Sequence, residues 1–183
     1  MNQDDKKLQW ISDWGSLPQK SGVIESKAVV PLAEKAAKGD AKTAQSLVQV
    51  LRKIPLLLGL SPSQIHKLLS ICEPQTRSPG DFLLQSGQTS TSMFILLAGE
   101  LAVITQEGLN VAQIEPVTTV GEMGIIVRHP SSVSVEAVRP SQILALNKER
   151  FDAVLREDRE MQTLVYRNLI ATLSSRLLHG NIR

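Results

Sequence analysis

The sequence predicts a mainly β fold with flanking helices, an antiparallel β-roll or jelly roll that follows a helical N-terminal extension. Short apolar runs succeed one another closely from residue 76 to residue 146, and glycine or proline separates them. Apolar residues at helical spacing lie before and after this stretch. Strands at this density, without a helix after each one, are typical of an antiparallel barrel or roll.

The N-terminal part, residues 1–53, has the pattern of a partly flexible helical extension, and residues 54–183 have that of the main domain. Trp10 and Trp14 are spaced as on one helix face, and Asp40 is a candidate N-cap for a further helix. The two tryptophans would either dock on the roll or contact a protein partner. Docking is the interpretation that we favour.

The helices of the main domain have recognisable starts. Ser61, Pro62 and Gln64 have the composition of a capped helix start, and this helix should run to about Ile71. Cys72, the only cysteine of the chain, is expected to be a packed structural thiol. The C-terminal part holds two further predicted helices, over 148–155 and 158–178, and the second carries an apolar stripe of Met161, Leu164, Val165, Leu169, Leu173 and Leu177.

Six strands are predicted between these helices, and turn residues separate them. They cover residues 82–84, 93–97, 101–105, 111–114, 133–138 and 143–146. Glycines at the breaks suit corners of a roll, where a positive φ angle or a close approach of two backbones is needed.

The residues with the clearest chemistry lie where a predicted strand ends. A glycine, a carboxylate and one apolar helical turn follow one another in Gly121-Glu122-Met123-Gly124. The first N–H groups of such a helix suit a phosphate, and Glu122 could accept hydrogen bonds from sugar hydroxyls. Ser131 and Ser132 would add neutral donors. The pattern thus suits a phosphate beside a sugar, but it lacks a cation at the head of the second strand.

The stretch resembles the phosphate-binding cassette of cyclic nucleotide-binding domains, the sensor domains of proteins such as the catabolite activator protein and the regulatory subunits of protein kinase A. Gly121, Glu122 and Gly124 match its first half, and Val133 matches an apolar position of its second half. Ser131 stands where the family has a phosphate-binding arginine.

The likeness extends over residues 54–178. Ser78-Pro79-Gly80-Asp81 and Gln85-Ser86-Gly87-Gln88 look like two turns of the family, and residues 93–101 look like one of its strand pairs. The resemblance implies a ligand pocket closed by the C-terminal helix, with Glu122 on the ribose 2′-OH and the serines near the phosphate. In the family, that helix also forms dimers when it is long.

The missing arginine weakens the expected site. A hydrogen bond between arginine and phosphate contributes about 1.5–3 kcal/mol, so its loss would weaken binding by roughly 10- to 100-fold. Arg128 lies three residues before Ser131 and could replace the charge if its loop folds inward, although we expect it to face solvent. A neutral row of serines would also tolerate the phosphate of a cyclic dinucleotide.

Composition and motifs argue against several other functions. The net charge is +2, which implies no strong affinity for nucleic acid. His66, His129 and His179 are dispersed, and no catalytic or metal-binding motif occurs, so we expect no enzyme activity, no metal and no cofactor. The start of the chain does not read as a signal peptide and no run is long enough to cross a bilayer, so we expect a cytoplasmic protein without membrane contact.

These observations predict a non-catalytic regulatory or sensory module that binds cyclic AMP or cyclic GMP. The residues predicted to bind are Gly121, Glu122, Met123, Gly124, Arg128, Ser131, Ser132 and Val133. Two alternatives stay open: a degenerate domain that serves as a protein-interaction scaffold, and a receptor for a cyclic dinucleotide. A weak homodimer through the C-terminal helix and the N-terminal extension is a further expectation.

Overall fold

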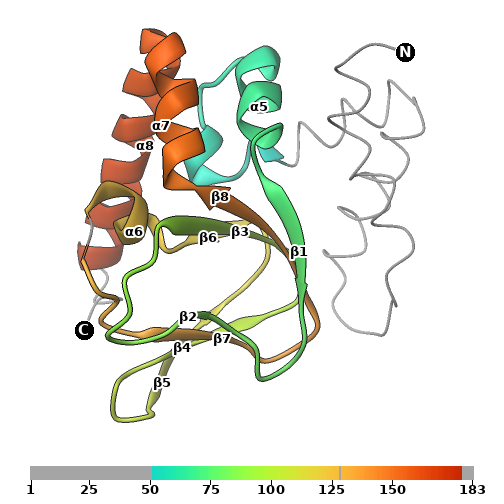
Figure 1. Ribbon diagram of the computed structural model, residues 1–183, viewed down its shortest axis with the longest axis vertical. Helices are drawn as coiled ribbons and strands as arrows, with labels where there is room; N and C mark the ends of the chain where they lie inside the picture. Colours follow the sequence, from blue (N-terminus) through green and yellow to red (C-terminus); the bar gives the residue numbers. More distant parts are fainter. Residues whose placement is uncertain (1–50, 128, 179–183) are drawn as a thin grey trace.

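The computed structural model describes residues 51–127 and 129–178. Two four-stranded antiparallel sheets face each other, and helices cover the outer face of one of them (Figure 1). The predicted mainly β fold with flanking helices is therefore confirmed. Apart from residues 51–53, the predicted helical extension with Trp10, Trp14 and Asp40 lies outside the described residues, so it stays a prediction.

The elements agree closely with the predicted ones. They are η2 (Pro55–Leu57), α5 (Pro62–Leu69), β1 (Glu73–Arg77), β2 (Phe82–Leu84), β3 (Ser92–Ala98), β4 (Leu101–Ile104), β5 (Asn110–Ile114), β6 (Thr118–Val120), α6 (Glu122–Ile126), β7 (Ser134–Ala137), β8 (Ser141–Asn147), α7 (Lys148–Glu157) and α8 (Arg159–Leu178). The sequence does not predict β1 and β6. β1 is a polar edge strand that contains Pro74, and β6 is only three residues long.

Each sheet has a defined strand order. The first sheet runs β1-β8-β3-β6 and the second runs β2-β7-β4-β5. β3 lies inside the first sheet and is buried on both faces, which explains its unbroken apolar sequence. Met93, Ile95 and Leu97 pack under the helices, whereas Phe94 and Leu96 pack between the two sheets. The roll therefore has two apolar cores with β3 between them.

The helical layer packs on the first sheet through apolar side chains, and its helix α5 has a capped start. Ser61 and Gln64 form a complete capping box at the start of α5, as the sequence predicts. Cys72 follows α5, and burial raises the pKa of its thiol to about 12. The thiol is therefore protonated at neutral pH, as expected of a packed structural cysteine.

The longest of the described helices, α8, connects the helical layer with the end of the roll (Figure 1). The carboxylate of Asp158 accepts a hydrogen bond from the backbone N–H of Met161, which lowers the pKa of this carboxyl. Further along the helix, the amide of Asn168 donates to the carbonyls of Leu56 and Leu58 beside η2. These bonds and the buried inner face of the helix set the position of its last turns.

Candidate functional site

A cavity of about 530 Å³ lies at the end of the roll, between α6, the neighbouring strands and the last turns of α8. We call it the cassette cavity. Its walls include seven of the eight predicted binding residues: Gly121, Glu122, Met123, Gly124, Ser131, Ser132 and Val133. Arg128 lies outside the described residues. The structure thus brings the predicted residues together, and their part in binding stays a prediction.

Two glycines allow α6 to lie close to the preceding strands. Gly121 is the N-cap of α6 and has a φ angle of +83°, in the left-handed region that favours glycine. A Cβ atom at Gly124 would lie 2.5 Å from the carbonyl oxygen of Ser90, closer than real Cβ atoms come. Glycine at these two positions therefore permits the sharp turn from β6 into α6 and the contact with the segment before β3.

Glu122 lies at the start of α6 and is buried, with only 2% of its surface exposed. Its carboxylate accepts a hydrogen bond from the hydroxyl of Thr119. It also pairs with the guanidinium of Arg176, with Nη1 2.7 Å from Oε2 and Nη2 3.0 Å from Oε1. The carboxylate predicted to bind a sugar thus already holds a cation.

Arg176 extends from the last turns of α8 into the same wall of the cavity. Besides its pair with Glu122, its Nη2 donates to the backbone carbonyl of Thr119 at 2.7 Å. Sequence reasoning missed this residue. The available signal was its position three residues after Leu173, which places a cation on the apolar face of the helix.

Ser131, in the wall of the cavity, makes hydrogen bonds to neighbouring residues. The hydroxyl of Ser131 donates to the carbonyl of Val133 at 2.7 Å. Its backbone N–H donates to Gln88, and its carbonyl accepts from the N–H of Gly87. Ser132 is exposed at the rim. Ser131 therefore occupies the arginine position of the family pattern with a neutral hydroxyl that already has an acceptor.

The charges around the cassette cavity are few. Among the described residues that line it, Glu115 and Glu122 carry negative charges and Arg176 carries the one permanent positive charge. His129 also lines the cavity. Much of the remaining wall is apolar, and it includes Val111, which is 51% exposed. This arrangement suits a ligand with a large uncharged body and at most one anionic group.

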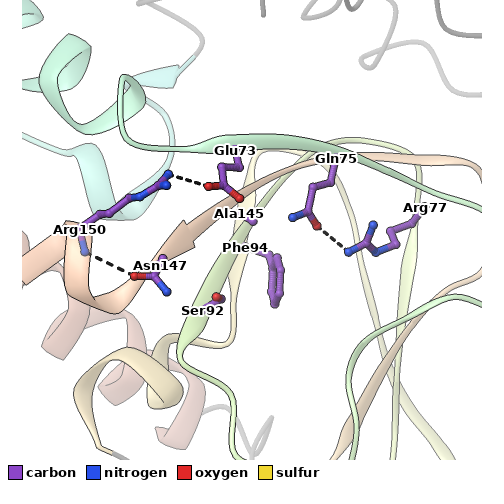
Figure 2. A pocket seen from close by; sticks show the side chains of 8 residues that line it. All are labelled: Glu73, Gln75, Arg77, Ser92, Phe94, Ala145, Asn147 and Arg150. Atoms are coloured by element: carbon purple, nitrogen blue, oxygen red, sulfur yellow. Dashed lines mark hydrogen bonds and ion pairs between the residues drawn. The ribbon is translucent and has the colours of Figure 1, made fainter. Parts of the chain in front are cut away.

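A second hollow of about 430 Å³ lies on the inner face of the first sheet, near its β1 edge (Figure 2). Its charged and polar side chains pair with one another. Arg150 donates to Glu73 at 2.6 Å, and Arg77 donates to Gln75 at 2.5 Å. None of the predicted binding residues lines this β1 hollow. It is therefore distinct from the cassette cavity.

No helix in the described part of the chain combines the length and the apolar character needed to cross a bilayer. Within the same residues, no three His, Cys, Asp or Glu side chains lie together as metal ligands would.

Comparison with known proteins shows what this chain is similar to. A family model described as the cyclic nucleotide-binding domain matches residues 74–158. Mouse (Mus musculus) cGMP-dependent protein kinase 2 is 28% identical over 135 residues, which cover 74% of this chain and 18% of the kinase. The cAMP-dependent protein kinase regulatory subunit of Hypocrea atroviridis is 28% identical over 105 residues, which cover 57% of this chain and 22% of that protein. The chain thus spans about a fifth of the length of these relatives.

Solved structures show the same architecture. The catabolite activator protein of Thermus thermophilus is 26% identical, with a TM-score of 0.61 over 69% of this chain and 60% of that chain. A cyclic nucleotide-binding domain from Methylobacillus flagellatus is 22% identical, with a TM-score of 0.66 over 75% of this chain and 80% of that chain. At that identity, the second likeness shows the fold alone.

Proposed function

We propose that the cassette cavity binds a cyclic nucleotide and that the chain acts as a regulatory or sensory module, as the match of residues 74–158 to the cyclic nucleotide-binding domain model supports. The observation that carries this proposal is Glu122, a buried carboxylate in the wall of a cavity large enough for a small ligand. A carboxylate kept from water by the protein is suited to recognise hydroxyl groups.

Glu122 retains the capacity for one more hydrogen bond. An ionised carboxylate has about four acceptor directions. The hydroxyl of Thr119 and the two N–H groups of Arg176 use three of them. The fourth, on Oε2, would accept the ribose 2′-OH, so sugar binding does not require the ion pair to break. The apolar wall would take the base and the face of the sugar.

The identity of the base is a separate question. The named relatives include a cGMP-dependent kinase and a regulatory subunit of a cAMP-dependent kinase, so both nucleotides are candidates for this chain. We expect it to bind at least one of them, and a cyclic dinucleotide remains an alternative to be screened. The absence of catalysis and a cytoplasmic location remain predictions too.

Thermal unfolding with a panel of ligands tests the proposal. At a ligand concentration 100 times above Kd, binding to the folded state adds about 2.7 kcal/mol of stability. For a domain of this size, Tm should then rise by roughly 5–11 °C. The panel contains cyclic AMP, cyclic GMP and cyclic dinucleotides. If millimolar cyclic mononucleotide leaves Tm unchanged, the proposal is wrong.

A matched pair of variants locates the binding. Glu122→Gln removes the buried carboxylate while keeping its size, and Glu73→Gln makes the same change in the β1 hollow. The ligand-induced shift in Tm should fall in the first variant and persist in the second. Equal shifts in both variants would contradict the role assigned to Glu122.

A protein-interaction scaffold is the second candidate function, and two observations favour it. Arg176 already occupies the carboxylate of Glu122, and the hydroxyl of Ser131 is bonded to Val133. A pocket whose polar groups satisfy one another can persist without a ligand. In that case no cyclic mononucleotide or dinucleotide of the panel would raise Tm.

A further inference from the structure

The proposed ligand carries a negative phosphate, and the structure restricts where its counter-charge can come from. Ser131 is neutral, and its hydroxyl donates to the carbonyl of Val133 at 2.7 Å. Among the described residues that line the cassette cavity, Arg176 has the one permanent positive charge. Within the described part of the chain, the cation is thus delivered by α8.

Two N–H groups of Arg176 donate to no described residue. A guanidinium has five N–H groups, and three of them donate to Glu122 and Thr119. No described residue accepts from the other two, which belong to Nε and Nη1. The side chain is 28% exposed and lines the cavity, so the guanidinium is accessible to a ligand there. Glu122 and Arg176 together therefore offer one acceptor and two donors side by side.

We propose that Arg176 binds the anionic group of the ligand in place of the absent cassette arginine. This inference rests on the proposed function. A hydroxyl of the ligand binds Glu122, its phosphate binds Arg176, and the existing ion pair stays intact between them. Because Arg176 belongs to α8 and Glu122 to α6, one ligand bridges the two helices. Ligand binding thereby holds the last turns of α8 against the cavity.

Charge removal at two arginines tests this proposal. Arg176→Gln should weaken the binding of cyclic AMP or cyclic GMP by about 10- to 100-fold, because a charge-assisted hydrogen bond to phosphate is lost. Arg150→Gln makes the same change in the β1 hollow and should leave the affinity unaltered. Isothermal calorimetry measures both affinities. An unchanged Kd in Arg176→Gln would overturn the proposal.

A rescue variant separates a contact with phosphate from support of the fold. Ser131→Arg places a cation at another position in the wall of the cavity, on the segment before β7 rather than on α8. Ser131→Arg should raise the affinity more in the Arg176→Gln background than in the unaltered protein, because the two cations would serve the same phosphate. If Arg176 acts only by supporting α8, Ser131→Arg will raise the affinity by the same factor in both backgrounds, and the proposal is overturned.

A neutral pair keeps the test valid if Arg176→Gln alone does not fold. That variant buries an unpaired carboxylate, whereas Glu122→Gln combined with Arg176→Gln does not. The double variant should bind cyclic nucleotide about 10- to 100-fold more weakly than Glu122→Gln alone. Equal affinities would count against Arg176. If the unaltered protein binds no cyclic nucleotide, the proposed function fails as well, whereas an unaltered affinity in the variants defeats this inference alone.

Discussion

Glu122 and Arg176 depend on each other, whatever the ligand. Removing one partner of a buried ion pair leaves an uncompensated charge and typically costs 3–5 kcal/mol. Glu122 is almost fully buried and Arg176 is partly exposed, so loss of the arginine should affect the protein more than a surface substitution would. The pair thus stabilises the contact between α6 and α8 and also equips the cassette cavity with charge.

Gly121 and Gly108 form a matched pair for a prediction about the turn into α6. Both have a φ angle of +83°, so alanine at either position should cost about 1–2 kcal/mol for its left-handed backbone. At Gly121 the new Cβ would also lie 3.1 Å from the carbonyl oxygen of Ser92, whereas at Gly108 it would meet nothing within 4 Å. Gly121→Ala should therefore lose a further 1 kcal/mol, roughly.

Urea unfolding of the two alanine variants measures this difference. Equal losses of unfolding free energy would mean that the contact between Gly121 and β3 is not tight. A larger loss in Gly108→Ala would contradict the account of the turn altogether.

Whether the sequence predicts a site residue depends on how far apart in the chain that residue and its contacts lie. The residues Gly121 to Gly124 form one local pattern of turn and helix start, so the sequence predicts their place around one site. Arg176 is 54 residues away from Glu122, and the meeting of the two depends on how α8 packs. Helical spacing places Arg176 beside Leu173 on one face, but it does not say what that face contacts.

At the scale of elements, the same distinction explains the two strands that the sequence does not predict. β3 is recognisable because burial on both faces demands an unbroken apolar run. β1 reads Glu-Pro-Gln-Thr-Arg and lies at a sheet edge, where pairing with β8 is enough to make it a strand. Its strand character comes from its partner rather than from its own composition.

Asn168 supports a prediction about the attachment of α8. It is 7% exposed, and its amide donates to the carbonyls of Leu56 and Leu58 at 3.1 and 2.7 Å. Asn168→Ala leaves these carbonyls without that donor and should lower the unfolding free energy by about 1–3 kcal/mol. Thr163→Ala on the exposed face of the same helix should change it by less than about 0.5 kcal/mol.

Chemical denaturation of both variants provides the comparison. If Asn168→Ala is as stable as Thr163→Ala, the segment around η2 is not held to α8 by this side chain, and the position of α8 must be attributed to its apolar contacts alone.

At the scale of the whole molecule, α8 does two things. Its inner face packs on the helical layer through Met161, Val165 and Leu169, and its last turns complete the wall of the cassette cavity. The expectation that the apolar stripe mainly docks on the domain agrees with this burial. Ile170 is 64% exposed on the outer face. A weak homodimer through this helix stays a prediction, which sedimentation velocity can test.

The overall fold is more predictable than the use of the cassette cavity. Turn signals, strand patterns and capped helices are all encoded locally, and their order alone indicates a roll. Whether the cavity is used depends on a contact between distant elements and on a ligand that the chain does not specify by pattern. The position of Ser131 shows this limit, because a missing arginine has different meanings depending on whether another cation enters the cavity.

The most direct test of the central claim, that the cassette cavity binds a cyclic nucleotide, is a titration followed by ¹H–¹⁵N NMR. We predict saturable shifts of the amides of Gly121, Glu122 and Gly124 on addition of cyclic AMP or cyclic GMP, with no shift at Gln75 and Arg77 of the β1 hollow. An absence of shifts at millimolar ligand, or shifts confined to the β1 hollow, would contradict the account.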